Sequence, residues 1–289
     1  MVMDILTVSG LCKRYSAFAL QDVSFSVGKG QIVGFIGRNG AGKTTTLKSL
    51  LNLVHPDAGE VSLFGLPFAG NELAVKRRVG FVSGGMEAYT KKRLRAVTAA
   101  VRPFYANWDE RAYRDCLSRF ELDESKTPDQ LSAGMRVKYA LTLALSHRAE
   151  LMILDEPTSG LDPISRDDLL ELFLTLARQG VGILFSTHIT SDLEKCADRI
   201  VYIQRGRIAA NETLDDFTAR YRSVALSEAE ATPEREKLLI GKKIAKHGFT
   251  ALVRAQDAQA LGLPCAPAAL EDVMVHLEKE DDRLEGAAE

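Results

Sequence analysis

Short alternating runs of apolar and polar residues fill the first 65 positions, and this alternation is typical of β-strands. The runs predict strands at 5–11, 20–27 and 31–37, with residues 28–30 (GKG) as a tight hairpin turn between the last two. A helix is expected at about 42–54, and the proline and glycine of HPDAGEVSLFG then lead into another strand. The front of the chain therefore predicts strands that flank a helix.

Apolar residues then recur three and four positions apart, which indicates helices. We expect a short helix at 72–78, a strand over GFVS, and mostly helix over 91–121. The last of these is interrupted near RPFYANWDE, where Asp109 is placed to cap the part that follows. The stretch LSAGMRVKYAL opens a further helix. Its apolar residues at helical spacing are Val137, Leu141, Ala144 and Leu145.

From residue 151 onward, solidly apolar strands alternate with helices. Strands are expected over LMILDE, VGILFST, RIVYIQ and RIAAN, with helices at 163–179 and from about Ser191. This alternation predicts an α/β fold around a mostly parallel sheet covered on both faces, which the antiparallel strands at the front make mixed.

The character of the sequence changes near residue 211, so we divide the chain into domains at 1–210 and 211–289. The second part holds polar LSEAEATPERE, strand-like KIAKHGFTALVRAQD and an amphipathic helix over PAALEDVMVHLEKE. We expect a small accessory domain that ends in a solvated acidic tail, EDDRLEGAAE.

Composition narrows the range of partners. Lys and Arg number 37 against 39 Asp and Glu, and this balance gives no general attraction to nucleic acid or to an anionic membrane surface. No apolar run approaches the ~20 residues that span a membrane, and the N-terminus lacks the apolar core of a signal peptide. Any role at a membrane would need a partner. The four scattered cysteines, which favour reduced thiols in a cytosolic compartment, are Cys12, Cys116, Cys196 and Cys265.

The most specific motif is GRNGAGKT at 37–44, which fits the phosphate-loop pattern between a strand and a helix. Its glycines let the backbone curl into a nest of N–H donors, and the helix directs its positive end at the same anion. Lys43 is expected to reach the outer phosphates and Thr44 to bind Mg²⁺. A chance glycine turn is the disfavoured alternative. The expected nucleotide-binding residues are Gly37, Arg38, Asn39, Gly40, Ala41, Gly42, Lys43, Thr44 and Thr45.

Two carboxylates and a histidine follow apolar strands downstream. Asp155 and Glu156 end LMILDEP, and strand ends are where open α/β sheets bind ligands. Asp155 is suited to hold Mg²⁺ and Glu156 to accept a proton from an attacking water. The alternative is that both merely cap a helix. His188 lies in STHI. A lone histidine is more often a packed or solvated side chain, but its place at the end of a core strand makes it a candidate for catalysis.

The phosphate loop, LSAGM, LMILDEP, SGLD (159–162) and STHI occur in the order and rough spacing of the ATP-binding cassette family, which the chain resembles over residues 4–210. The resemblance implies ATP and Mg²⁺ as cofactors, an antiparallel β subdomain and a helical subdomain at about 85–148. It also implies two subunits, the same or homologous, paired head to tail. Ser132 and Gly134 of one subunit would then face the γ-phosphate held by the other, whereas Ser132 alone could be a simple helix cap.

The same resemblance assigns further roles. Tyr15 matches the aromatic residue that stacks on adenine, although a core tyrosine is an open alternative. His188 matches the residue that contacts the γ-phosphate and orients water, and Asp162 matches the residue that links the two sites. The chain departs from the family at Gly84, where a glutamine is usual, and this puts Mg²⁺ coordination at that point in doubt. The signature also carries Ala133 and Met135 in place of Gly and Gln.

LSAGMRVK, the short region at 90–130 and FYANWDE resemble the ATP-binding subunits of bacterial drug- and peptide-resistance exporters, whose permease is a separate chain. Such a subunit is cytoplasmic and bound to the inner face of the membrane through its permease. Glu87 is the candidate to replace the missing glutamine contact. The residues expected to form the permease groove, unless they pack in the core, are Met86, Tyr89, Phe104, Tyr105 and Trp108.

Two other classes of function are alternatives to transport. Chromosome and repair ATPases carry a long coiled coil between phosphate loop and signature, and ribosome factors carry two cassettes; this sequence shows neither feature. An ATPase with an assembly or regulatory role and no transport partner stays open. The transported substrate cannot be inferred from these motifs.

Overall fold

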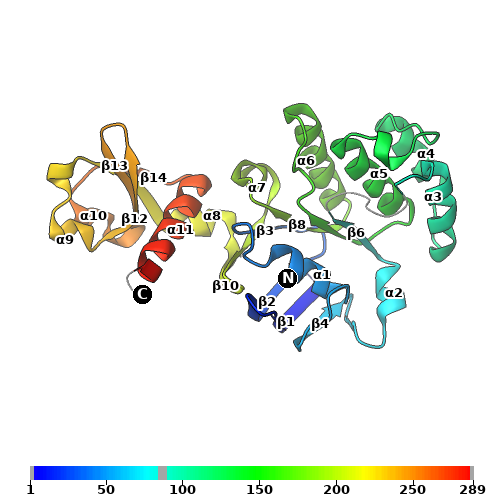
Figure 1. The fold of residues 1–289 in the computed structure, drawn as a ribbon, viewed down its shortest axis with the longest axis horizontal. Coiled ribbons are helices and arrows are strands. Elements are labelled where there is room, and N and C mark those ends of the chain that lie inside the picture. Colours follow the sequence, from blue (N-terminus) through cyan, green and yellow to red (C-terminus); the bar gives the residue numbers. More distant parts are fainter. Residues whose placement is uncertain (1–2, 84–89, 287–289) are drawn as a thin grey trace. The chain divides into compact units, whose positions relative to one another are not determined.

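The computed structural model describes residues 3–83 and 90–286, and the chain divides into two compact units, Met1–Asn211 and Glu212–Glu289 (Figure 1). The first unit is built around a six-stranded sheet in the order β10-β9-β3-β8-β7-β6. The strands are β3 (Ile32–Ile36), β6 (Val79–Ser83), β7 (Leu151–Asp155), β8 (Gly182–Thr187), β9 (Arg199–Gln204) and β10 (Arg207–Thr213).

Parallel pairing brings the carboxyl ends of the central strands together. β3 pairs with β8 and β9, and β7 pairs with β6 and β8, all in parallel. Every residue of β3, β7 and β8 is buried, as solidly apolar central strands predict. Asp155 lies opposite Ser186 in the register, and Ile36 lies opposite Thr187. The loops that follow these strands therefore open at one edge of the sheet.

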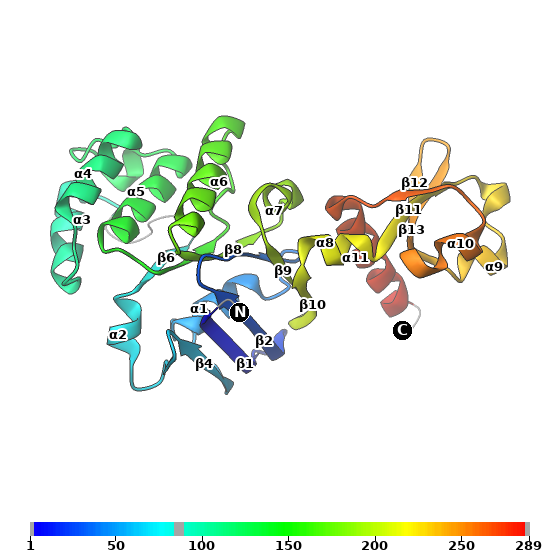
Figure 2. The same cartoon turned by 180° about the vertical axis from the view of Figure 1, so that it is seen from behind.

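Helices cover both faces of this sheet. In Figures 1 and 2, α6 and α7 lie on one side and α1 on the other. The helix after the phosphate loop ends at Leu50, four residues before the expected end, because a turn follows in which Asn52 takes a left-handed φ of 56°. The bounds are α1 (Lys43–Leu50), α2 (Glu72–Lys76), α6 (Pro163–Arg178) and α7 (Thr190–Cys196).

A second, antiparallel sheet in the order β2-β1-β4-β5 packs against α1 and the central sheet. The hairpin expected at residues 28–30 is wrong, because β2 and β3 belong to different sheets. The segment is a turn between sheets, in which a Cβ added at Gly30 would lie 2.9 Å from the carbonyl oxygen of Ala177. The strands are β1 (Asp4–Arg14), β2 (Ala19–Gly28), β4 (Ala58–Leu63) and β5 (Leu66–Pro67).

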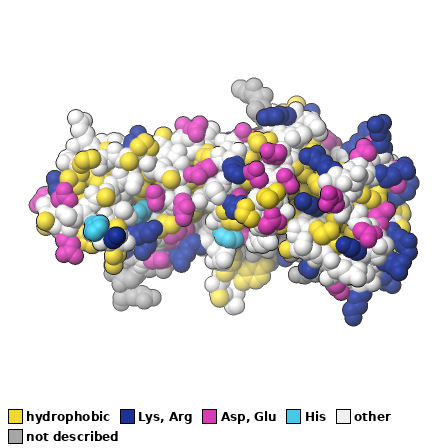
Figure 3. Space-filling view, turned by 90° about the horizontal axis from the view of Figure 1, so that it is seen from above, with side chains coloured by type: hydrophobic (Ala, Val, Ile, Leu, Met, Phe, Trp, Pro, Cys, Tyr) yellow, Lys and Arg dark blue, Asp and Glu magenta, His cyan; other side chains and the backbone are white. Residues whose placement is uncertain are grey.

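The helical group consists of α3 (Leu94–Val101), α4 (Glu110–Arg119) and α5 (Ala133–Ser146), around a small apolar core of its own. The expected cap is confirmed: the Asp109 side chain accepts hydrogen bonds from the backbone N–H groups of Arg111 and Ala112. Lys and Arg side chains gather over this group in Figure 3.

A chain of buried hydroxyl groups crosses this core. Thr98 Oγ1 lies 2.8 Å from the Tyr113 hydroxyl and 2.7 Å from the Tyr139 hydroxyl. Tyr113 donates in turn to Glu124, and Tyr139 donates to the carbonyl oxygen of Leu94. Burial raises the pKa of Tyr139 to about 12, so these groups stay protonated at neutral pH.

The second unit is an antiparallel sheet in the order β12-β13-β11-β14, with α11 packed on β12. Gly241 of β12 fixes α11: its N–H donates to Glu280 Oε2, and its carbonyl accepts from His276 Nδ1. α11 runs to Gly286, so the expected acidic tail continues this helix as far as residue 286. The elements are α8 (Leu214–Ala219), β11 (Tyr221–Leu226), α9 (Pro233–Glu236), β12 (Leu239–Ala245), β13 (Gly248–Arg254), α10 (Ala258–Leu261), β14 (Cys265–Pro267) and α11 (Leu270–Gly286).

Candidate nucleotide-binding site

The phosphate loop joins β3 to α1 in a conformation that needs glycine. Gly40 and Gly42 take φ values of 84° and 114°, which other residues rarely adopt. A Cβ added at Gly37 would lie 2.3 Å from the carbonyl oxygen of Ile203, and one at Gly42 would lie 2.5 Å from the side chain of Leu20. At Gly40 an added Cβ would have no atom within 4 Å, so the outer turn of the loop faces open space.

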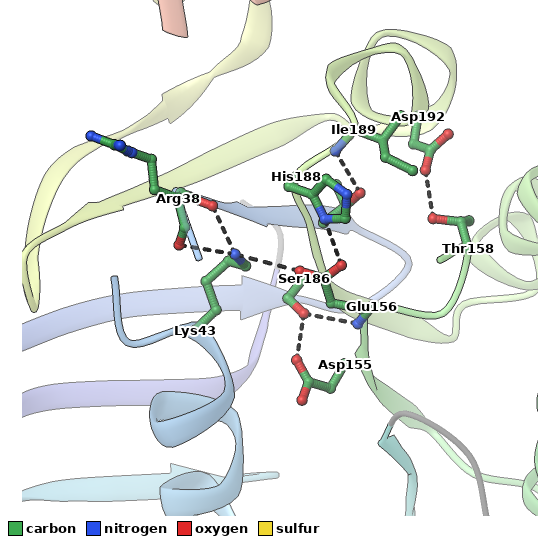
Figure 4. A network of polar contacts seen from close by, with 11 residues as sticks. Arg38, Lys43, Asp155, Glu156, Thr158, Ser186, His188, Ile189 and Asp192 are labelled. Carbon is green, nitrogen blue, oxygen red and sulfur yellow. Dashed lines mark hydrogen bonds and ion pairs between the residues drawn. The ribbon is translucent and has the colours of Figure 1, made fainter. Parts of the chain in front are cut away.

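Lys43 lies at the start of α1 and is 5% exposed. Its ammonium group donates to the carbonyl oxygens of Gly37 at 2.7 Å and Arg38 at 3.2 Å (Figure 4). Within the described chain no side chain caps α1, so the N-terminal N–H groups of this helix remain available to an anion. Thr44 is exposed in the same turn.

Asp155 and Glu156 are fixed by Ser186 from the neighbouring strand. The Ser186 hydroxyl donates to Asp155 Oδ1 at 2.7 Å and accepts from the Glu156 N–H at 2.9 Å. Glu156 takes a φ of 51°, a left-handed conformation that is unusual for a glutamate and is typical of functional sites. Sequence reasoning missed Ser186, although it stands in the same STHI stretch and directly opposite Asp155 in a parallel pair.

The carboxylate of Glu156 lies between two other predicted site residues. Its Oε2 is 2.6 Å from His188 Nδ1, and its Oε1 is 3.4 Å from the Lys43 ammonium group (Figure 4). Glu156 is 24% exposed and His188 46% exposed, so solvent reaches the pair. The structure therefore brings the Lys43 cation to a carboxylate and an imidazole that lie more than a hundred residues further along the chain.

Tyr15 lies in the loop between β1 and β2 and is 46% exposed, so it is not a core residue. The same loop reaches the phosphate loop, because a Cβ added at Gly42 would lie 2.8 Å from Phe18 Cζ. A shallow depression lined by Tyr15, Phe18 and Arg207 opens here. An exposed ring beside the phosphate loop can stack on a nucleotide base.

Ser132 and Asp162 both cap helices. Ser132 Oγ accepts from the Met135 N–H at 3.2 Å, and Asp162 accepts from the N–H groups of Ile164 and Ser165. Bonds from Ser165 hold the pKa of Asp162 below its usual value. Ser132 starts α5 in the helical group, whereas Lys43 starts α1 on the other side of the sheet (Figures 1 and 2). The chain thus does not bring its own signature to its own phosphate loop.

The signature also contacts the loop that ends in Asp162. A Cβ added at Gly134 would lie 2.9 Å from Leu161 Cδ2, and one at Gly160 would lie 4.0 Å from Ala133 Cβ. The start of α5 therefore rests on the segment between Glu156 and α6 within one chain.

The expected permease groove is described only in part, because Gly84, Met86, Glu87 and Tyr89 lie outside the described residues. Phe104 is 66% exposed, while Trp108 packs on Tyr113 with ring centroids 5.4 Å apart, as core packing predicts. Tyr105 stacks on His147 at 3.9 Å. A groove between β6 and the helical group is lined by Leu51, Leu53, Val97, Val101, Tyr105 and His147.

The fold and these groups define a phosphate-loop nucleotide-hydrolase domain, and the similarities to known proteins agree. The family model for ABC transporters matches residues 20–159. The bacitracin transport ATP-binding protein of Bacillus licheniformis is 32% identical over 75% of this chain and 72% of its own length. The daunorubicin resistance ATP-binding protein of Streptomyces coeruleorubidus is 30% identical over 98% of both chains.

A solved structure of an ATP-binding subunit of an ABC transporter is 34% identical and aligns with a TM-score of 0.67 over 73% of this chain and 91% of its own. This chain belongs to the ABC transporter family, as a nucleotide-binding ATPase subunit. In the part of the chain that the structure describes, we find no helix that is both long and apolar enough to cross a membrane.

Proposed function

We propose that the site binds ATP with Mg²⁺ through the residues singled out by the sequence. Residues 37–45 supply backbone donors, Lys43 supplies the cation, and Thr44 and Asp155 supply oxygen ligands for Mg²⁺. Two observations support the fit: open space lies beside Gly40, and Asp155 Oδ2 has no hydrogen bond to any described residue. Bound Mg²⁺ would neutralise charge on the phosphate oxygens. Tyr15 would stack on the adenine.

Hydrolysis would depend on Glu156 as the acceptor of a proton from water, with His188 orienting the water and contacting the terminal phosphate. The observation that carries this proposal is the position of the Glu156 carboxylate between Lys43 and His188. When phosphates draw the Lys43 ammonium group toward them, Glu156 Oε1 loses that partner and becomes free to accept a proton.

A second ATPase subunit would complete the site. The exposed Ser132 and the half-buried Gly134 mark a helix start with no nucleotide site of its own, and a helix start with a hydroxyl group is suited to a phosphate. Ser132 Oγ already accepts from Met135 N–H, which leaves the hydroxyl proton to be donated. Asp162, exposed at the start of α6, would contact the partner subunit and link the two sites.

The permease is the second proposed partner, and it would dock in the groove between β6 and the helical group. Apolar side chains and the Tyr105 ring line this groove, and such surfaces receive amphipathic helices. The relatives named for bacitracin transport and daunorubicin resistance support export as the direction. The chain would then act at the cytoplasmic face of the membrane, held there by its permease and without a nucleic-acid partner.

The direct test is Mg²⁺-dependent release of phosphate from ATP by the full chain. Chelation of Mg²⁺ should abolish turnover. Capture of a separately encoded multi-span membrane protein by the tagged chain tests the transport role, and Tyr105→Asp should weaken that capture without reducing ATP binding. If the chain hydrolyses ATP but captures no membrane protein, an assembly or regulatory role replaces transport.

A further inference from the structure

Asp192 is a fully buried carboxylate that none of the proposed roles uses. It lies in α7 with an exposed fraction of 0%. Its Oδ2 accepts from the Thr158 hydroxyl at 2.7 Å (Figure 4). Its Oδ1 forms an ion pair with Arg166 Nε. Arg166 also donates to the Ser191 hydroxyl at 2.6 Å. A buried charge is tolerated only when partners satisfy it, and here two partners do so.

These partners come from the segments that carry the catalytic groups. Thr158 is two residues beyond Glu156, and Asp192 is four residues beyond His188. Arg166 lies one turn into α6, which begins at the Asp162 cap. The Asp192 carboxylate thus joins the loop after β7, the first turns of α6, and α7.

The short helix α7 depends on contacts with its neighbours to stay in place. It has only seven residues, and its N-cap, Ile189, offers no side-chain hydrogen bond. Glu156 has a left-handed backbone, and both Glu156 and His188 are accessible to solvent. Besides the Ser186 bond to the Glu156 N–H, the buried Thr158–Asp192 bond joins the loop that carries Glu156 to the helix that follows His188, and so supports their 2.6 Å contact.

We propose that Asp192 is a positioning residue that holds His188 in register with Glu156, through Thr158 on one side and Arg166 on the other. This inference rests on the proposed function, since it assumes that Glu156 and His188 act on the attacking water. A displacement of about 1 Å in such a pair lowers turnover by as much as ~10²-fold without a change in binding contacts. The expected signature is a loss in kcat at an unchanged nucleotide affinity.

The chain offers a matched control. Lys195 and Asp167 also join α7 to α6, with an ion pair at 2.6 Å whose side chains are more than half exposed. Such a surface pair contributes little to stability. Asp167→Asn therefore makes the same chemical change as Asp192→Asn, in an ion pair that joins the same two helices but is exposed to solvent.

The experiment compares Thr158→Val, Asp192→Asn and Asp167→Asn in the full chain. Thr158→Val keeps the shape and the Arg166 ion pair but removes the hydroxyl group, so kcat should fall at least ~10-fold while the Kd for a fluorescent nucleotide stays within about twofold. Thr158→Ser should restore most of the activity. Asp167→Asn should match the wild type. Melting curves verify that each variant is folded, and Thr158→Val carries the test if Asp192→Asn unfolds.

A double-mutant cycle tests whether Asp192 affects turnover through His188. If Asp192 acts through His188, then Thr158→Val should cost almost nothing in kcat when added to His188→Ala. Additive losses, or a kcat for Thr158→Val equal to that of Asp167→Asn, would overturn the inference and leave Asp192 as structural only. A wild-type chain that does not hydrolyse ATP would instead overturn the proposed function.

Discussion

Glu156 and His188 lie 2.6 Å apart, although 31 residues separate them along the chain. They meet because β7 and β8 are parallel neighbours whose carboxyl ends coincide. Glu156 also faces Lys43 at 3.4 Å, so one carboxylate connects the phosphate-binding and hydrolytic parts of the site. The first prediction concerns this carboxylate.

Replacement of Glu156 by Gln should abolish turnover but not binding. The amide keeps the shape of the side chain yet cannot accept the proton, so steady-state hydrolysis should fall by the ~10²–10⁴ typical of the loss of a general base. Uncleaved ATP should then hold two subunits together, which size-exclusion chromatography would show as an ATP-dependent dimer. Unchanged turnover would contradict the role given to Glu156.

The signature should act on a neighbouring subunit. Ser132→Arg and Lys43→Ala should each inactivate a homodimer, because each removes one half of both composite sites. Mixed dimers keep one intact site, made from Lys43 of one chain and Ser132 of the other, so mixing should recover part of the activity. If mixing restores nothing and ATP produces no association, Ser132 is only the cap of α5.

Residues 212–289 should be dispensable for nucleotide binding. Each predicted contact to ATP lies in the first unit, whose sheet and core contain no strand after β10. A chain that ends at Asn211 should bind a fluorescent ATP analogue with the affinity of the full chain, within about threefold. Thermal melting must first show that the shortened chain is folded. Loss of affinity in a folded chain would contradict this division.

Acid should destabilise the fold partly through His147. Burial lowers the pKa of His147 from 6.5 to about 4, so the folded state disfavours its charged form. As the pH falls, His147 takes up a proton in the unfolded chain before it does so in the folded chain. The free energy of unfolding should therefore keep its full value above pH 6.5 and decrease between pH 6.5 and pH 4. For this group alone the loss amounts to roughly 3 kcal/mol.

The matched variant is His147→Phe, which keeps a ring against Tyr105 but cannot be protonated. Urea unfolding of both proteins at pH 7.5 and pH 4.5 gives the comparison. The variant should lose less stability than the wild type over this interval, because the other titrating groups are common to both. Equal losses would show that His147 is not the responsible group.

The sequence alone predicted most of the first unit, for physical reasons. Solid apolar runs bounded by turn residues predict β3, β7 and β8, since strands buried on both faces are apolar throughout, and the Asp109 cap follows from a local hydrogen bond. The hairpin at 28–30 failed because the turn residues GKG suit a chain that pairs back beside β2 as well as one that crosses to another sheet. Local patterns carry no information on that choice.

Local sequence patterns predict only part of the candidate site as well. The phosphate loop and Glu156 could be singled out as candidates because each belongs to a short contiguous motif. Ser186 and Asp192 could not, because their roles depend on partners that are about thirty residues away in sequence and adjacent only through strand register and helix packing. Sequence reasoning therefore finds the groups that react sooner than the groups that hold them.

The hydroxyl chain in the helical group contains fewer protons than contacts. Tyr113 gives its proton to Glu124, and Tyr139 gives its proton to the Leu94 carbonyl. Thr98 has one hydroxyl proton for two neighbouring oxygens, so at any instant it donates either to Tyr113 of α4 or to Tyr139 of α5. The core of this group consequently has two hydrogen-bond arrangements that interconvert by rotation about the Cβ–Oγ1 bond of Thr98, and the Tyr139 bond to Leu94 keeps α5 joined to α3 in both.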